Sequence, residues 1–201
     1  MKPVSLLESA HQFIKSALMA GDVAIDATLG NGHDTLFLAH CVGDRGHVYG
    51  FDIQIQAIQA TRQRLMAHDL LERVSLNHAC HSQMETYVNG VVKAIMFNLG
   101  YLPGADKHLI TRVETTLQAV AAGCRLLAKE GVMTVLAYPG HPGGDIEADE
   151  LQLWVNSLDV RSFKVELILS HHQSETAPRL FVIRALRDLV KSIPFYANES
   201  P

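Results

Sequence analysis

The feature that most constrains the fold is a short apolar run at residues 23–27, followed at once by a glycine-containing turn at 28–32. The run has the length and composition of a buried strand, and the pattern at 34–41 predicts a helix directly after the turn. Glycines allow the backbone to turn tightly there. A strand that leads through such a turn into a helix indicates a parallel α/β unit, in which ligands bind at the carboxyl ends of the strands.

The same alternation of strand and helix patterns continues along the chain. Further strands are predicted at 46–51, 73–77, 91–97, 131–138, 163–169 and 180–186, and further helices at 5–20, 54–68, 83–88, 109–127 and from the loop at 141–144 to about 158. Only about ten residues separate the last two strands, too few for a helical crossover, so these strands should be antiparallel. We expect one α/β domain over residues 1–201, with a mostly parallel seven-stranded sheet, an antiparallel C-terminal strand and helices on both faces.

Composition narrows the class of protein. With 48% hydrophobic and 19% charged residues in 201, the chain should form a folded core. It lacks the roughly 18 consecutive apolar residues that span a bilayer, and Glu8, His11 and Lys15 interrupt the apolar pattern where a secretory signal would lie. Three scattered cysteines without a Cys-x-x-Cys pair predict reduced thiols in the cytoplasm and no metal site. Because the formal net charge is -4, any contact with nucleic acid requires a local basic patch.

The strongest motif spans residues 26–35 and favours one nucleotide ligand over two others. A phosphate-binding P-loop would need a lysine after the second glycine, and none follows Gly32. A dinucleotide fingerprint is weakened by Thr35 in place of its third glycine and by Asp26 near an anionic pyrophosphate. S-adenosylmethionine has no phosphate, and its cationic amino-acid end would be attracted by Asp26 and approached by the backbone from Gly30 to Gly32. A plain strand-to-helix turn is the alternative.

Polar residues after the second and third strands are candidates for the rest of this cofactor. Asp52 ends the second strand, 20 positions after Gly32, where a carboxylate can accept both ribose hydroxyls. It could equally cap the next helix. Gln54 could reach the ribose or the adenine edge, and His81 with Ser82 follows the third strand beside the expected adenine. A structural histidine is the alternative for His81.

The segment 98–104 follows the fourth strand and holds glycines, a proline and an aromatic residue, as expected of a loop around a reacting centre. Asn98 can hydrogen-bond an acceptor amine or the cofactor, and Tyr101 can stack on a base. A simple connection between strand and helix is the alternative.

Three segments carry a resemblance to a known family: DATLGNGHDTLFLA (26–39), GHVYGFDIQ (46–54) and FNLGYLP (97–103). Together with shorter matches at 114–119, 138–141 and 177–178, they resemble the bacterial S-adenosylmethionine-dependent methyltransferases labelled rRNA methylases. The resemblance runs over nearly the whole chain. It implies a Rossmann-like class I methyltransferase fold and methylation of the aminomethyl nitrogen of 5-aminomethyl-2-thiouridine at the wobble position of certain tRNAs.

The resemblance also implies roles for single residues. The loop 98–101 matches the position facing the acceptor, whereas Leu29 and Pro139 depart from residues found in relatives. The positions that match cofactor contacts are Asn31, Asp34, Asp52, Gln54 and His81.

For the reaction we expect in-line transfer of the methyl group from the sulfonium to a neutral amine. Burial beside a sulfonium would lower the amine's pKa, since like charge and desolvation both disfavour the ammonium. Tyr101, Asp106 and His141 are candidates for orienting this amine, and the sequence assigns no general base.

The expected partner is the anticodon region of tRNA, read as a single strand. The basic candidates for its phosphates are Lys107, Arg112, Arg161, Lys164 and Arg179, and a homodimer could complete the binding surface. An rRNA or small-molecule methyltransferase on the same fold is an alternative. A non-catalytic nucleotide-binding module is a second one, against which the polar loop at 98–104 argues.

Overall fold

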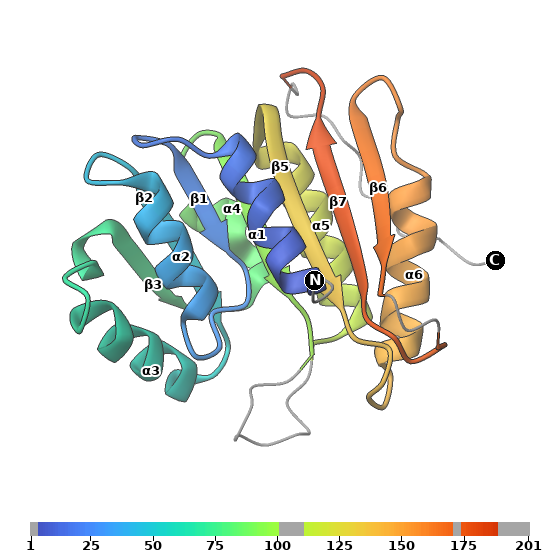
Figure 1. Cartoon of the computed structure of the whole chain (residues 1–201), viewed down its shortest axis with the longest axis horizontal. Coiled ribbons are helices and arrows are strands. Elements are labelled where there is room, and N and C mark those ends of the chain that lie inside the picture. The colour runs from blue at the N-terminus through green and yellow to red at the C-terminus, as the bar shows by residue number, and fades with distance from the viewer. Residues whose placement is uncertain (1–3, 101–110, 171–173, 189–201) are drawn as a thin grey trace.

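The computed structural model describes residues 4–100, 111–170 and 174–188. The predictions for Tyr101, Asp106 and Lys107 lie outside these residues. Seven strands form one mixed sheet in the order β3-β2-β1-β4-β5-β7-β6 (Figure 1). The strands are β1 (Val23–Asp26), β2 (His47–Asp52), β3 (Val74–His78), β4 (Val92–Asn98), β5 (Leu127–Ala137), β6 (Phe163–Leu169) and β7 (Arg179–Ala185).

Strand directions confirm the predicted sheet. The five strands from β3 to β5 in the sheet are parallel, and β7 pairs antiparallel with both β5 and β6. The connection from β6 to β7 is too short for a crossover, which forces this reversal. β1 lies between β2 and β4, so the direction of strand order reverses beside it, at the place where open α/β sheets bind ligands.

Helices cover both faces of the sheet, as predicted (Figure 1). One apolar layer joins α1, α2 and α3 to the sheet, and the other joins α4, α5 and α6 to it. The helices are α1 (Leu6–Ala17), α2 (His33–Val42), α3 (Ile55–Met66), α4 (Met84–Tyr87), α5 (Val113–Leu126) and α6 (Gly144–Asn156), with short 3-10 turns η1 (Leu71–Arg73) and η2 (His81–Gln83).

α1 has a sharply defined start. The Ser5 hydroxyl accepts the Glu8 N–H at 3.1 Å, and the Glu8 carboxylate accepts the Ser5 N–H at 2.8 Å, forming a capping box. Ile14 and Ala10 are buried against the sheet, where α1 packs across β5 and β7. The helix ends at Ala17, three residues before the predicted end. This packing brings His11 of α1 to Asp34, near the start of α2.

β5 differs from its prediction. It begins at Leu127 rather than at 131, directly after α5. The register to β4 shifts between Val92 and Ala94, and Glu130 has a φ of 61°. A Lys-Glu-Gly run at 129–131 resembles a turn, but here it forms an irregularity inside the strand. Among the described residues, none of the helices has both the length and the apolar character needed to cross a bilayer.

Candidate functional site

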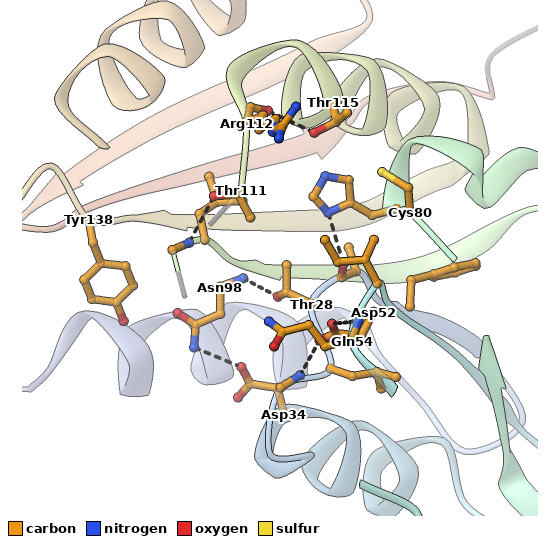
Figure 2. A pocket seen from close by; sticks show the side chains of 18 of the residues that line it. Thr28, Asp34, Asp52, Gln54, Cys80, Asn98, Thr111, Arg112, Thr115 and Tyr138 are labelled. Carbon is orange, nitrogen blue, oxygen red and sulfur yellow. Dashed lines mark hydrogen bonds between the residues drawn. The ribbon is translucent and has the colours of Figure 1, made fainter. Parts of the chain in front are cut away.

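A cavity of about 790 Å³ opens at the carboxyl ends of the parallel strands (Figure 2). This is the size of a cofactor or small-ligand pocket. Its wall comes from the loops that follow β1, β2, β3, β4 and β5, with further residues from the start of α5 and from the segment before β7. Parallel strands bring these loops to one edge, although they lie far apart in the sequence.

Asp26 supports the first loop from below. It is 1% exposed, and its carboxylate accepts the Thr28 N–H at 3.1 Å and the Thr35 hydroxyl at 2.6 Å. Burial and the nearby charge of Asp34 raise the pKa of Asp26 to about 7. Asp26 does not line the cavity. It therefore shapes the turn, and its attraction of the cofactor stays a prediction.

The two glycines of the turn have different roles. Gly32 has a φ of 77° and begins α2, and a Cβ there would lie 2.8 Å from the Thr61 hydroxyl. It permits α2 to approach α3 and does not line the cavity, and its contact with a ligand stays a prediction. Gly30 and Asn31 do line it. The Asn31 carbonyl is fixed from outside by the Arg64 side chain, 2.6 Å away.

Asp52 lies where the ends of β1 and β2 meet. One carboxylate oxygen accepts the Gly30 N–H at 3.0 Å, and the other accepts the Gln54 N–H at 2.9 Å. Burial raises the pKa of Asp52, and these backbone hydrogen bonds oppose the shift. Each oxygen keeps a lone pair for a further donor. Asp52 and the buried Gln54 both line the cavity, so the carboxylate is held ready for a diol such as a ribose.

His81 is buried in the wall after β3. Burial lowers the pKa of His81 to about 4, so the ring is neutral near neutral pH. Its Nδ1 lies 3.2 Å from the Ala27 carbonyl and donates to it, and its Nε2 is buried with no partner among the described residues. An unpartnered acceptor in the wall fits a ligand that donates an N–H. Ser82 donates to Cys80 at 3.1 Å and lies outside the wall, and its contact with the cofactor stays a prediction.

Asp34, Asn98 and Tyr138 gather their polar groups at the other end of the cavity (Figure 2). The Asn98 backbone N–H donates to the Thr28 hydroxyl at 2.7 Å, and its side-chain amide lies 3.4 Å from an Asp34 oxygen. Burial and the Asp34 charge raise the pKa of Tyr138. Asn98 therefore lies with these polar groups, and its role at an acceptor site stays a prediction. Sequence reasoning did not single out Tyr138, although it directly follows a strand that ends at this edge.

A buried carboxylate fixes the base of the loop after β4. Glu147 of α6 is 3% exposed and accepts the hydroxyls of Thr111 at 2.7 Å and Thr116 at 2.6 Å. The Thr111 hydroxyl also accepts the Gly100 N–H at 3.1 Å. Neither Thr111 nor Glu147 was predicted, because no local pattern indicates a pair that lies 36 residues apart. His141, a predicted amine-orienting residue, lines the same side of the cavity.

These residues fit S-adenosylmethionine. Asp52 would hold the ribose, His81 and Gln54 the adenine, and the backbone of Gly30 and Asn31 the amino-acid end. The unpartnered Nε2 of His81 matches the amino group of the adenine. When bound, the cofactor supplies an electrophilic methyl group, and the chain supplies position and surroundings.

Solved structures resemble the chain over almost its whole length. The "putative rRNA-methylase" from Clostridium thermocellum is 39% identical, with a TM-score of 0.89, and the match covers 92% of this chain and 100% of that chain. A "putative methyltransferase" from Streptococcus mutans, solved in complex with SAH, is 36% identical with a TM-score of 0.82, covering 92% and 99%. Among curated proteins, the "tRNA (mnm(5)s(2)U34)-methyltransferase, chloroplastic" of Arabidopsis thaliana is 40% identical over 163 residues, or 76% of this chain. The chain spans 60% of the length of this plant relative.

The fold and the cavity define a class I S-adenosylmethionine-dependent methyltransferase. The family model described as "Putative rRNA methylase" matches residues 48–184. The chain belongs to this family. The predicted fold, enzyme class and cofactor are thereby confirmed, and the non-catalytic binding module is set aside.

Proposed function

We propose that the chain methylates the aminomethyl nitrogen of 5-aminomethyl-2-thiouridine at the wobble position of tRNA, giving 5-methylaminomethyl-2-thiouridine. The observation that carries this proposal is the 40% identity over 163 residues to a protein named for that nucleoside. The single domain expected over residues 1–201 would hold the whole catalytic site, although the plant relative is longer.

The acceptor end of the cavity supports a basic acceptor. Asp34 offers a buried carboxylate, and Asn98 and Tyr138 add an amide and a phenol beside it. A carboxylate held away from water attracts an ammonium strongly and accepts a charge-assisted hydrogen bond from it. A carbonyl or thiol acceptor would gain little from such a group.

The predicted phosphate contacts that the structure describes lie at opposite ends of the strands. Arg161 and Lys164 lie at the start of β6. Because β6 runs parallel to β5, its start lies at the amino ends of the parallel strands, away from the cavity at their carboxyl ends. Arg179 begins β7, opposite the end of β5, and its side chain is held by Asp149 at 2.6 Å. Arg112 lines the cavity, is exposed, and has no side-chain partner among the described residues. We therefore propose Arg112 as the first contact with the anticodon backbone.

We further propose a compartment and an oligomeric state for the protein. The three cysteines are free thiols, which suits a reaction in the cytoplasm. A homodimer stays a prediction, to be checked by sedimentation of the purified protein with and without tRNA.

An rRNA substrate is the second candidate, favoured by the description of the matching family. A small-molecule amine is a third, since the net charge of -4 does not draw polyanions to the protein.

The experiment that tests the proposal offers the purified protein tRNA from cells that lack the enzyme, undermodified rRNA and free aminomethyl nucleoside in parallel. Each receives labelled S-adenosylmethionine, and the nucleosides are identified by mass spectrometry. We expect conversion of aminomethyl-thiouridine to its methylated form in tRNA alone. Label in rRNA, or equal conversion of the free nucleoside, would favour the second or third candidate.

A further inference from the structure

A histidine of α1 reaches the acceptor end of the cavity through a buried carboxylate. The Nε2 atom of His11 lies 2.7 Å from one oxygen of Asp34. The ring of His11 stacks on Phe37, with centroids 4.0 Å apart and planes inclined by 7°, so its orientation is fixed. The His11 side chain is 28% exposed, whereas that of Asp34 is 9% exposed. The pair therefore runs from the interior of the site toward the solvent.

The second oxygen of Asp34 faces the acceptor end. It lies 3.4 Å from the Asn98 amide, and Asp34 lines the cavity together with Asn98 and Tyr138 (Figure 2). One carboxylate thus has one oxygen on the side of the substrate and the other on the imidazole. An imidazole is the side chain that exchanges protons near neutral pH.

We infer that Asp34 and His11 form the proton outlet for the acceptor amine, with Asp34 touching the amine and His11 receiving the proton through it. This inference rests on the proposed function, because it requires an amine that enters as an ammonium. Asp34 would be a catalytic residue. His11 would be a positioning residue, since it acts through Asp34.

The step balances in atoms and charge. An N–H bond of the bound ammonium breaks, and the proton passes to Asp34 and on to the imidazole of His11. The nitrogen lone pair left behind attacks the methyl carbon as the C–S bond breaks, and the bonding pair stays on sulfur in a neutral thioether. The product is a secondary ammonium, and the imidazolium of His11 releases its proton to water.

Three acidic groups interact electrostatically with the pair. Glu8, one turn earlier on α1, interacts electrostatically with His11. Asp26 of β1 and Tyr138 of β5 both interact with Asp34.

The first test compares single-turnover methyl transfer to undermodified tRNA in wild-type protein and in His11→Ala across pH. We expect the variant to be slower by roughly 10²-fold at neutral pH, to lose the imidazole limb of the pH profile, and to regain rate when free imidazole is added. His47→Gln is the matched control, because His47 is also partly buried and bonded, 2.8 Å from Ser75, but lies outside the cavity wall. An unchanged rate and profile in His11→Ala, or a loss that imidazole does not restore, would overturn the inference.

The second test measures binding without turnover. Wild-type protein, saturated with SAH, is titrated with an anticodon stem-loop that carries either the aminomethyl group or an unmodified uridine. We expect Asp34→Asn, measured at saturating SAH, to lose most of the preference for the aminomethyl form. Equal preference in both proteins would overturn the role of Asp34. If the wild-type protein itself shows neither preference nor transfer, the proposed substrate fails instead, so the two failures are distinguishable.

Discussion

The two ends of the cavity are held together differently. At the cofactor end, side chains bond mostly to backbone: Asp52 accepts the N–H groups of Gly30 and Gln54, and His81 donates to the Ala27 carbonyl. At the acceptor end, side chains bond mostly to other side chains from helices on both faces of the sheet, as the His11–Asp34 and Thr111–Glu147 pairs show. The sheet fixes its own backbone, so the cofactor end follows from strand positions alone. The acceptor end depends on how α1 and α6 pack.

The most severe change should be Asp52→Ala at the cofactor end. Two hydrogen bonds from ribose hydroxyls to a carboxylate would be lost, so affinity for S-adenosylmethionine should fall roughly 10³-fold. Calorimetric titration measures it, with Asp44→Ala as a matched control, because Asp44 is an exposed acid in an ion pair with Arg73. Asp52→Asn should lose less, since it keeps the shape. Full affinity in Asp52→Ala would remove the residue from the ribose site.

His81 tests whether the cofactor end is as desolvated as its burial indicates. Its pKa is lowered to about 4 in the folded state, so protonation favours the unfolded chain, and its stabilising contribution is lost as pH falls from about 6.5 to about 4. At about 1.4 kcal/mol per unit, this loss is about 3 kcal/mol. Asp26, with its raised pKa, acts in the opposite sense, so the contribution is isolated as a difference from His81→Gln.

The measurement is denaturant unfolding at several pH values without cofactor. His78→Gln is the control, because His78 is an exposed histidine that lies 2.9 Å from a backbone carbonyl oxygen, that of Ile53. If wild type and His81→Gln lose stability in parallel between pH 6.5 and 4, His81 is already solvated and the contrast between the two ends weakens.

Sequence reasoning succeeded where the chain's local pattern sets the geometry. Asp52 ends a parallel strand, and Gln54 and His81 lie shortly after the ends of two such strands, so their place at one end of the sheet could be predicted. It did not predict contacts between residues far apart in the sequence, such as that of Thr111 with Glu147. The pairing of His11 with Asp34 spans 23 residues, and the only signal was a histidine inside an apolar helical stripe.

Asn98→Ala should slow methyl transfer and leave cofactor affinity unchanged, whereas Asp52→Ala should weaken cofactor binding. The Asn98 backbone N–H, which bonds the Thr28 hydroxyl, is kept, so the strand end and the cofactor affinity should not change. The lost amide contacts Asp34, so the methyl-transfer rate should fall roughly 10- to 10²-fold through poorer orientation of the amine. Single-turnover kinetics measure the rate, with Asn77→Ala on β3 as a control outside the cavity. A parallel loss of cofactor affinity would show that the two ends are not separable.

The smallest expected effect tests whether the acceptor end depends on α6. Thr111→Val keeps the shape but removes the hydroxyl that joins the Gly100 N–H to Glu147, which leaves a buried carboxylate oxygen without this donor. The free energy of unfolding should fall by about 1–2 kcal/mol. The transfer rate should fall only a few-fold, and affinity for S-adenosylmethionine should stay as in wild type.

Thr86→Val, at an exposed threonine of α4, is the control. Because Glu147 still accepts the Thr116 hydroxyl, α5 stays bonded to α6 in the variant, and any loss of rate reports the loop base alone. A loss of cofactor affinity equal to the loss of rate would mean that the loop after β4 serves both ends, and the division between a backbone-held and a side-chain-held half would be wrong.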